Sequence, residues 1–206
     1  MPDNTNAKYN KILDALQALL EEKSIGTISV REIAEKAGIG KGSIYYYFSS
    51  KEAIMEALVE RDYQKPLDTA KSLAGQREIS PFTRMAMIFQ ACRTSSTEFG
   101  IRQTSDSQTE APEKAFIHQR YITYLIQELT PTLTEIIQQG IDGGDIHFDN
   151  PSALAEIVLI VLAVKLDNTL VPSTQEEIEN TIVGLISLLE NGTGNPPGSL
   201  NFLRVL

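Results

Sequence analysis

The chain contains little of what several protein classes require. With one cysteine, Cys92, and two histidines among 206 residues, it can form neither an internal disulfide nor a Cys/His zinc cluster, and we expect no metal and no cofactor. Its richest apolar run, at 157–164, is far shorter than the roughly 20 residues of a membrane-spanning helix. The first residues lack the charged and then apolar pattern of a secretory signal. These absences predict a cytoplasmic chain without a membrane partner.

The sequence also lacks the short motifs of common catalytic sites. It contains no G-x-S-x-G, no H-E-x-x-H, no glycine-rich phosphate loop and no Rossmann fingerprint. The adjacent acids Glu176 and Glu177 fall at the start of a predicted helix, where the helix dipole favours negative charge. We therefore expect no enzymatic activity.

Negative charge is unevenly distributed along the chain. The formal net charge is −9, of which residues 1–65 contribute −1 and residues 66–206 contribute −8. Between Lys36 and Lys51 there are three lysines and no acid. Because salt screens charges beyond roughly 8–10 Å, a local positive segment is compatible with binding to phosphates in an acidic protein.

That segment follows the pattern of a helix-turn-helix. Ser29 and Glu32 have the spacing of a capping box at a helix start, and Gly38 is placed to end the helix in a left-handed conformation. Ser49 and Glu52 predict a second capping box that opens the next helix. The apolar face of the first helix is formed by Val30, Ile33, Ala34 and Ala37.

Three consecutive tyrosines follow the turn. Ile44 and Phe48 are four residues apart and can face the core together, which leaves some of the tyrosines at 45–47 on the surface. Hydroxyl and amine donors beside flat apolar rings suit phosphates and base edges. Gly42, which is unfavourable inside a helix, suggests that the backbone there approaches another molecule closely.

These residues resemble those of one protein family. The stretch T-I-S-V-R-E-I-A-E-K-A-G-I-G-K-G-S-I-Y-Y-Y-F-S-S-K-E-A-I, within residues 8–62, is similar to the DNA-binding head of TetR/AcrR transcriptional regulators. The resemblance implies an all-α fold with an N-terminal three-helix DNA-binding head and a C-terminal helical ligand-binding and dimerisation domain. We expect the head at 5–65, its motif at about 29–48, the second domain at 66–190 and a tail at 191–206.

The resemblance also implies roles for individual residues at a double-stranded DNA operator. Arg31 reaches a base edge or a phosphate, Tyr45 and Tyr47 bond phosphates, and Lys51 adds a further phosphate contact. The residues implied to face the major groove are Lys41, Gly42, Ser43 and Tyr46. The family expectation is a repressor that binds a palindromic operator as a homodimer and is released by a small molecule.

Several alternatives remain open from the sequence. Arg31 has the spacing of an i,i+4 ion-pair partner for Glu35, and Lys51 can be an ordinary exposed lysine. The tyrosines can instead be buried against neighbouring helices. The chain can be a helical interaction protein that keeps the head fold without DNA affinity.

Helical periodicity continues through the rest of the chain. A first helix has its stripe at Ile12, Leu13, Leu16, Leu19 and Leu20 and ends near Gly26. Further helices are predicted from Ser49 past Lys65, from Pro81, from Glu113 to the glycines at 140–144, from Pro151 to about Leu170, and from Thr174 to about Leu189. We expect a loop or short helices at 94–108, and an apolar end at 200–206 that docks on the protein.

The last two predicted helices carry the expected dimer interface. The segment at 157–164 is apolar on nearly all sides, and such a helix requires burial all round. It pairs with the helix from Thr174 to form half of a four-helix dimer bundle, or else it is the core helix of a monomer. The predicted interface residues are Ile157, Ile160, Val161, Val164, Ile182, Leu185, Ile186 and Leu189.

The middle of the chain is expected to enclose the pocket of the small-molecule effector. Such pockets are mostly apolar with a few polar groups. The candidate lining residues are Phe89, Cys92, Arg93, Phe99, Arg102, His118, Tyr121 and Tyr124. The two arginines favour an anionic or carbonyl ligand, or else form ion pairs in an acidic domain.

Overall fold

A computed structural model describes residues 3–103, 111–168 and 171–205 and, in these ranges, shows eight α-helices, two short 3-10 helices and no strand. The all-α prediction is therefore confirmed. The chain divides into two compact units, one of residues 1–62 with 97–120 and the other of residues 63–96 with 121–206. None of the described helices combines the length and the hydropathy that a bilayer crossing requires.

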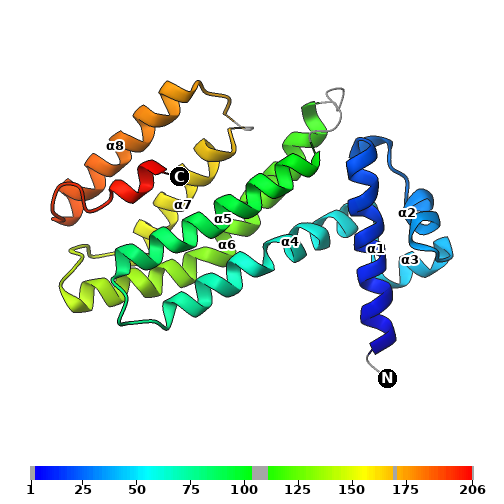
Figure 1. Ribbon diagram of the computed structural model, residues 1–206, viewed down its shortest axis with the longest axis horizontal. Coiled ribbons are helices and arrows are strands. Elements are labelled where there is room, and N and C mark those ends of the chain that lie inside the picture. The colour runs from blue at the N-terminus through cyan, green and yellow to red at the C-terminus, as the bar shows by residue number, and fades with distance from the viewer. Residues whose placement is uncertain (1–2, 104–110, 169–170, 206) are drawn as a thin grey trace. The chain divides into compact units, whose positions relative to one another are not determined.

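The N-terminal unit contains the helix-turn-helix (Figure 1). Helix α1 (Asp3–Glu22) is followed by the 3-10 turn η1 (Ile25–Thr27), α2 (Val30–Ala37), α3 (Lys41–Tyr47) and the first part of α4 (Lys51–Ala74). The predicted stripe of α1 is buried, as are Ile33 of α2, Ile44 of α3 and Ile54 of α4. The buried residues of α1, α2, α3 and the first part of α4 form the core of the head, and Ile44 anchors α3 to it.

The capping predictions are confirmed in α2 and displaced by one residue in α4. Ser29 and Glu32 form the reciprocal capping box, and Gly38 ends α2 with a φ of 68°. At α4 the cap is Ser50, whose Oγ accepts the Ala53 N–H at 3.2 Å, so the predicted cap at Ser49 is wrong by one position. Two adjacent serines offer the same hydroxyl, and the sequence does not distinguish them.

Helices α4, α5 (Pro81–Gln103) and α6 (Ala111–Gly143) are long, and each has residues in both units. The predicted loop at 94–108 is wrong over 94–103, because α5 continues to Gln103, and 104–110 lie outside the described residues. The unit boundary at Asp62 lies one turn before Pro66, which α4 accommodates without ending. A proline inside a helix removes one backbone hydrogen bond there.

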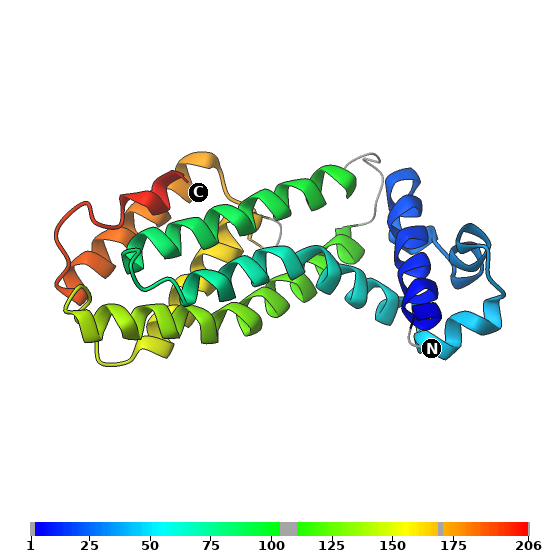
Figure 2. The same cartoon turned by 60° about the horizontal axis from the view of Figure 1, so that its bottom comes forward.

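The C-terminal unit is completed by α7 (Pro151–Asp167), α8 (Gln175–Thr193) and the 3-10 turn η2 (Asn201–Val205), with α7 and α8 side by side in both views (Figures 1 and 2). Helices α7 and α8 begin where the sequence predicts, and the structure adds their caps, Asn150 for α7 and a Thr174–Glu177 capping box for α8. The expected docking of the last residues is confirmed, since Leu200 and Leu203 are buried.

A buried arginine and a close approach at a glycine help to hold the C-terminal unit together. Arg84 of α5 is only 1% exposed, and its Nη1 donates to the Ala74 carbonyl oxygen at 3.2 Å and to Gln139 Oε1 at 2.6 Å. A cation at the C-terminal end of α4 is favoured by the helix dipole. Gly140, predicted to end a helix, lies inside α6, where a Cβ atom would come within 2.7 Å of Ile146.

Candidate DNA-binding surface and effector pocket

Helix α3 presents one buried side and one exposed side. Ile44 and Phe48 are 1% and 5% exposed, and the Phe48 ring lies 4.8 Å from the ring of Tyr9 on α1. On the other side, Tyr45 is 52% exposed and Tyr46 is 80% exposed. Burial of both tyrosines against neighbouring helices is therefore excluded in this chain.

The exposed side of α3 carries most of the predicted contact residues. Lys41, Gly42 and Ser43 are exposed, and Tyr47 is half-buried, with its ring 5.1 Å from the Tyr46 ring in an edge-on arrangement. A Cβ atom at Gly42 would meet nothing within 4 Å, so no neighbour in the described chain requires glycine there. The open space leaves this backbone free to approach an external molecule.

The positive groups of the head differ in their partners. Lys41 has no ion pair in the part of the chain that the structure describes, whereas Lys36 pairs with Glu22 at 2.7 Å. Lys51 Nζ donates to the Ile25 carbonyl oxygen at 2.8 Å and so ties the start of α4 to η1. Lys41 is thus the lysine best placed for an external anion.

Arg31 adopts the alternative predicted from its spacing. Its Nε donates to Glu35 Oε1 at 2.8 Å, and both side chains are largely exposed. This hydrogen bond raises the pKa of Arg31. An exposed ion pair of this kind contributes little to stability, so the arginine can exchange Glu35 for a phosphate at small cost.

The start of α2 is fixed electrostatically. Glu32 accepts hydrogen bonds from Lys23 and from the backbone and side chain of Ser29, and these contacts lower the pKa of Glu32 to about 2. The helix therefore keeps its cap charged over the whole physiological pH range.

The predicted pocket residues do not form one group. Phe89 lines a pocket, whereas Cys92 and Tyr121 are buried elsewhere in the core and Tyr124 is half-buried. Burial raises the pKa of the Cys92 thiol to about 12, which excludes a reactive thiolate. The side chains of Arg93, Phe99, Arg102 and His118 lie outside the described residues.

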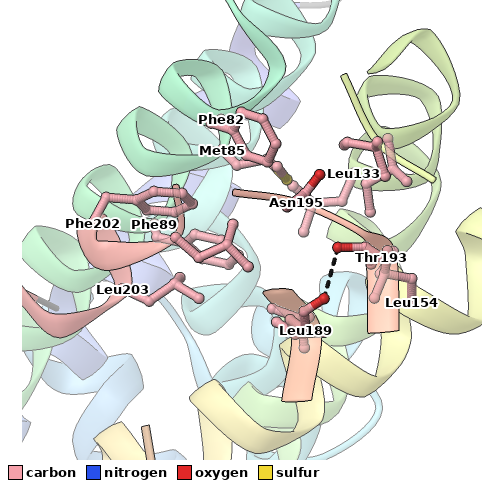
Figure 3. A pocket seen from close by; sticks show the side chains of 15 residues that line it. Phe82, Met85, Phe89, Leu133, Leu154, Leu189, Thr193, Asn195, Phe202 and Leu203 are labelled. Carbon is pink, nitrogen blue, oxygen red and sulfur yellow. Dashed lines mark hydrogen bonds between the residues drawn. The ribbon is translucent and has the colours of Figure 1, made fainter. Parts of the chain in front are cut away.

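The pocket itself lies between α5, α6, α7, α8 and the residues after α8 (Figure 3). Its lining includes Phe82 and Met85 of α5, Leu133 of α6 and Leu154 of α7, together with Phe202 and Leu203 after α8. Among these lining residues, Phe89 is the one that the sequence predicts as a pocket residue. The missed residues are spread over more than a hundred positions, so no local pattern marks them.

The predicted dimer residues are divided between surface and core. On α7, Ile157 is 50% exposed and Ile160 is 44% exposed, while Val161 and Val164 are half-buried. On α8, Ile182, Leu185 and Ile186 are buried within the chain and Leu189 lines the pocket. The exposed apolar residues of α8 are instead Val183 and Leu188, at 41% and 74%. These two residues are five positions apart, so they lie on opposite flanks of the buried stripe and form no stripe that periodicity could identify.

Two family models match this chain. The model for bacterial regulatory proteins of the tetR family matches residues 12–58, and the model described as tetracyclin repressor-like, C-terminal domain, matches residues 100–186. The match to the head coincides with the helix-turn-helix built by α2 and α3.

Individual proteins with similar sequences or structures are also regulators. The uncharacterized HTH-type transcriptional regulator YvdT of Bacillus subtilis (strain 168) is 41% identical over 71 residues, which are 34% of this chain and only 37% of YvdT. The HTH-type transcriptional repressor KstR2 of Mycolicibacterium smegmatis is 26% identical over 158 residues, 72% of each protein.

Among solved structures, SmeT, the repressor of the Stenotrophomonas maltophilia multidrug efflux pump SmeDEF, shares the fold. The TM-score is 0.67 at 15% identity, over 93% of this chain and 92% of SmeT. With the two matching family models, the chain belongs to the TetR family of bacterial helix-turn-helix transcriptional regulators.

Proposed function

We propose that this chain is a ligand-responsive repressor that binds a palindromic operator as a homodimer and is released by a small molecule. The observation that carries the proposal is the exposed side of α3, where Lys41, Tyr45 and Tyr46 present donors and ring faces above the buried Ile44 and Phe48. In the proposed complex, one set of residues contacts bases in the major groove: Lys41, Gly42, Ser43 and Tyr46. A second set contacts phosphates, with a base edge as the alternative for the first: Arg31, Tyr45, Tyr47 and Lys51.

The dimer part of the proposal is supported by the uncovered apolar side of α7 and α8. Ile157 and Ile160 project from a helix whose opposite face is buried, and Val183 and Leu188 project from its neighbour. A second copy that covers these residues would bring two α3 helices into one assembly, and reading a palindrome requires them to be about 34–36 Å apart or a multiple of that distance. A repressor of this kind acts where bacterial DNA lies, in the cytoplasm.

The direct experiment is a DNase I footprint of the full-length protein on the DNA upstream of its own gene. We expect a protected site with two-fold symmetry, and an affinity that falls steeply with salt because bound phosphates release counterions. An absence of protection there and in a random double-stranded pool would instead favour the interaction protein that keeps the head fold without DNA affinity.

A further inference from the structure

The last described residues form one side of the pocket in the C-terminal unit. Residues 195–205, the C-terminal cover, run back from α8, and Leu200 and Leu203 are buried beneath the surface that the cover forms. The free space inside the lining is small, about 40 Å³, which admits only a few water molecules. An organic ligand therefore fits only if part of the lining moves, and the cover is one such part.

The lining determines which chemistry the pocket accepts. It contains no charged side chain, and its aromatic residues are Phe82, Phe89 and Phe202. The polar groups are Thr193, whose hydroxyl already donates to the Leu189 carbonyl oxygen at 2.7 Å, and Asn195 (Figure 3). Asn195 is 93% buried, and its Oδ1 has no hydrogen-bond partner among the residues that the structure describes.

A buried acceptor without a donor is costly, and a ligand that supplies the donor removes this cost. We infer that the pocket beneath the C-terminal cover binds a neutral, largely apolar molecule with a hydroxyl or N–H group that donates to Asn195 Oδ1. The inference rests on the proposed function in one respect, because the bound molecule is the proposed effector. It departs from the anionic or carbonyl ligand that the arginines at 93 and 102 suggested.

The cover is fastened by one carboxylate. Glu190 Oε1 on α8 accepts the N–H of Gly198 at 2.8 Å and the N–H of Leu200 at 3.1 Å. The Asn195 N–H bonds the Glu190 carbonyl oxygen at 3.1 Å, and Gly194 reverses the chain with a φ of 65°. Loss of the Glu190 carboxylate releases two backbone bonds of the cover, so it lowers the cost of opening the pocket.

The test measures binding of two matched probes to the full-length protein by isothermal titration calorimetry. The probes are 4-ethylphenol and 4-ethyltoluene, which differ only by a hydroxyl in place of a methyl group. The variants are Asn195→Leu, which keeps the shape and removes the acceptor, and Glu190→Ala, which releases the cover. Glu176→Ala, an exposed glutamate of the same helix, is the control.

We expect the wild type to bind 4-ethylphenol about fivefold more tightly than 4-ethyltoluene. Asn195→Leu should bind both probes equally, and Glu190→Ala should bind both at least threefold more tightly than the Glu176→Ala control. A preference for the phenol that survives in Asn195→Leu overturns the role of Asn195. Failure of both probes to saturate the wild type and Glu190→Ala overturns the pocket, and unchanged affinity in Glu190→Ala overturns the opening of the cover.

Operator release is measured separately on footprinted DNA, so the two hypotheses fail independently. Binding of 4-ethylphenol with the Asn195 signature but without release contradicts the proposed effector response and supports the pocket. Operator binding without saturable binding of either probe supports the DNA-binding function and contradicts the pocket.

Discussion

Tyr46 on α3 is 80% exposed, whereas Asn195 in the C-terminal unit is 7% exposed and lies under the chain's own last residues. The exposed polar groups of α3 are accessible from solvent, as contact with a large external surface requires. Asn195 Oδ1 has no hydrogen-bond partner among the described residues, and the proposed small molecule would supply its donor. Under the two proposals, DNA meets donors that are exposed to solvent, whereas the ligand meets an unpaired acceptor in the protein interior.

The largest expected effect is on operator affinity. Lys41→Ala or Tyr46→Ala should weaken binding by at least about 30-fold, because each lost contact is worth roughly 1–3 kcal/mol and occurs once per half-site. Fluorescence anisotropy on the footprinted DNA measures the change. Lys71→Ala, an exposed lysine near the end of α4, serves as the control and should bind like the wild type.

Core truncation should separate the two regions. Ile44→Ala and Leu162→Ala each remove a buried aliphatic side chain and should each lower the free energy of unfolding by about 2–5 kcal/mol. Only Ile44→Ala should also weaken operator binding at temperatures where the protein stays folded, because Ile44 packs α3 against the core of the head. Circular dichroism in denaturant and anisotropy together measure both quantities. Equal DNA affinity in the two variants would contradict this separation.

The uncovered side of α7 and α8 is tested by charge insertion. In a two-fold symmetric dimer, Leu188→Asp places one carboxylate from each copy in the interface. This change should raise the dimer dissociation constant by at least about 100-fold, and analytical ultracentrifugation measures it. Met87→Asp alters an equally apolar, exposed residue on α5 and should leave the dimer intact. A wild type that sediments as a monomer at micromolar concentration would remove the dimer from the proposed function.

The smallest effect concerns acid stability. The pKa of Glu32 is lowered in the folded head from 4.5 to about 2, so the stabilisation by its carboxylate is complete above about pH 4.5 and is lost as the pH falls toward 2. Glu32→Gln keeps a capping acceptor that does not titrate. The unfolding midpoint of this variant should therefore fall less than that of the wild type as the pH is lowered from about 4.5 toward 2. Glu177→Gln in the matching capping box of α8, which lacks a lysine hydrogen bond, should show a smaller difference.

The head could be predicted from the sequence because its determinants are local. The capping box of α2, the left-handed Gly38 and the inward pair Ile44 and Phe48 each depend on residues a few positions apart. The error at α4 is of the same local kind, a cap at Ser50 instead of Ser49. Local signals of this type survive without knowledge of the tertiary structure.

The pocket could not be predicted because its determinants are distant in sequence. Phe82, Leu154 and Leu203 meet only when four helices and the C-terminal cover are assembled. On α8, Ile182, Leu185 and Ile186 share one buried face, whereas the apolar Val183 and Leu188 lie on either flank of it and are exposed. Periodicity identifies the buried stripe, but it does not tell whether an apolar residue beside the stripe is covered.

The central claim is that α3 reads DNA bases, and selection from a random double-stranded pool by the wild type and by Lys41→Ala tests it most directly. The account predicts that the wild type selects a two-fold symmetric sequence and that the variant loses its preference at one symmetric pair of positions. If the variant selects the same sequence with the same preference at every position, the assignment of Lys41 to base reading is contradicted.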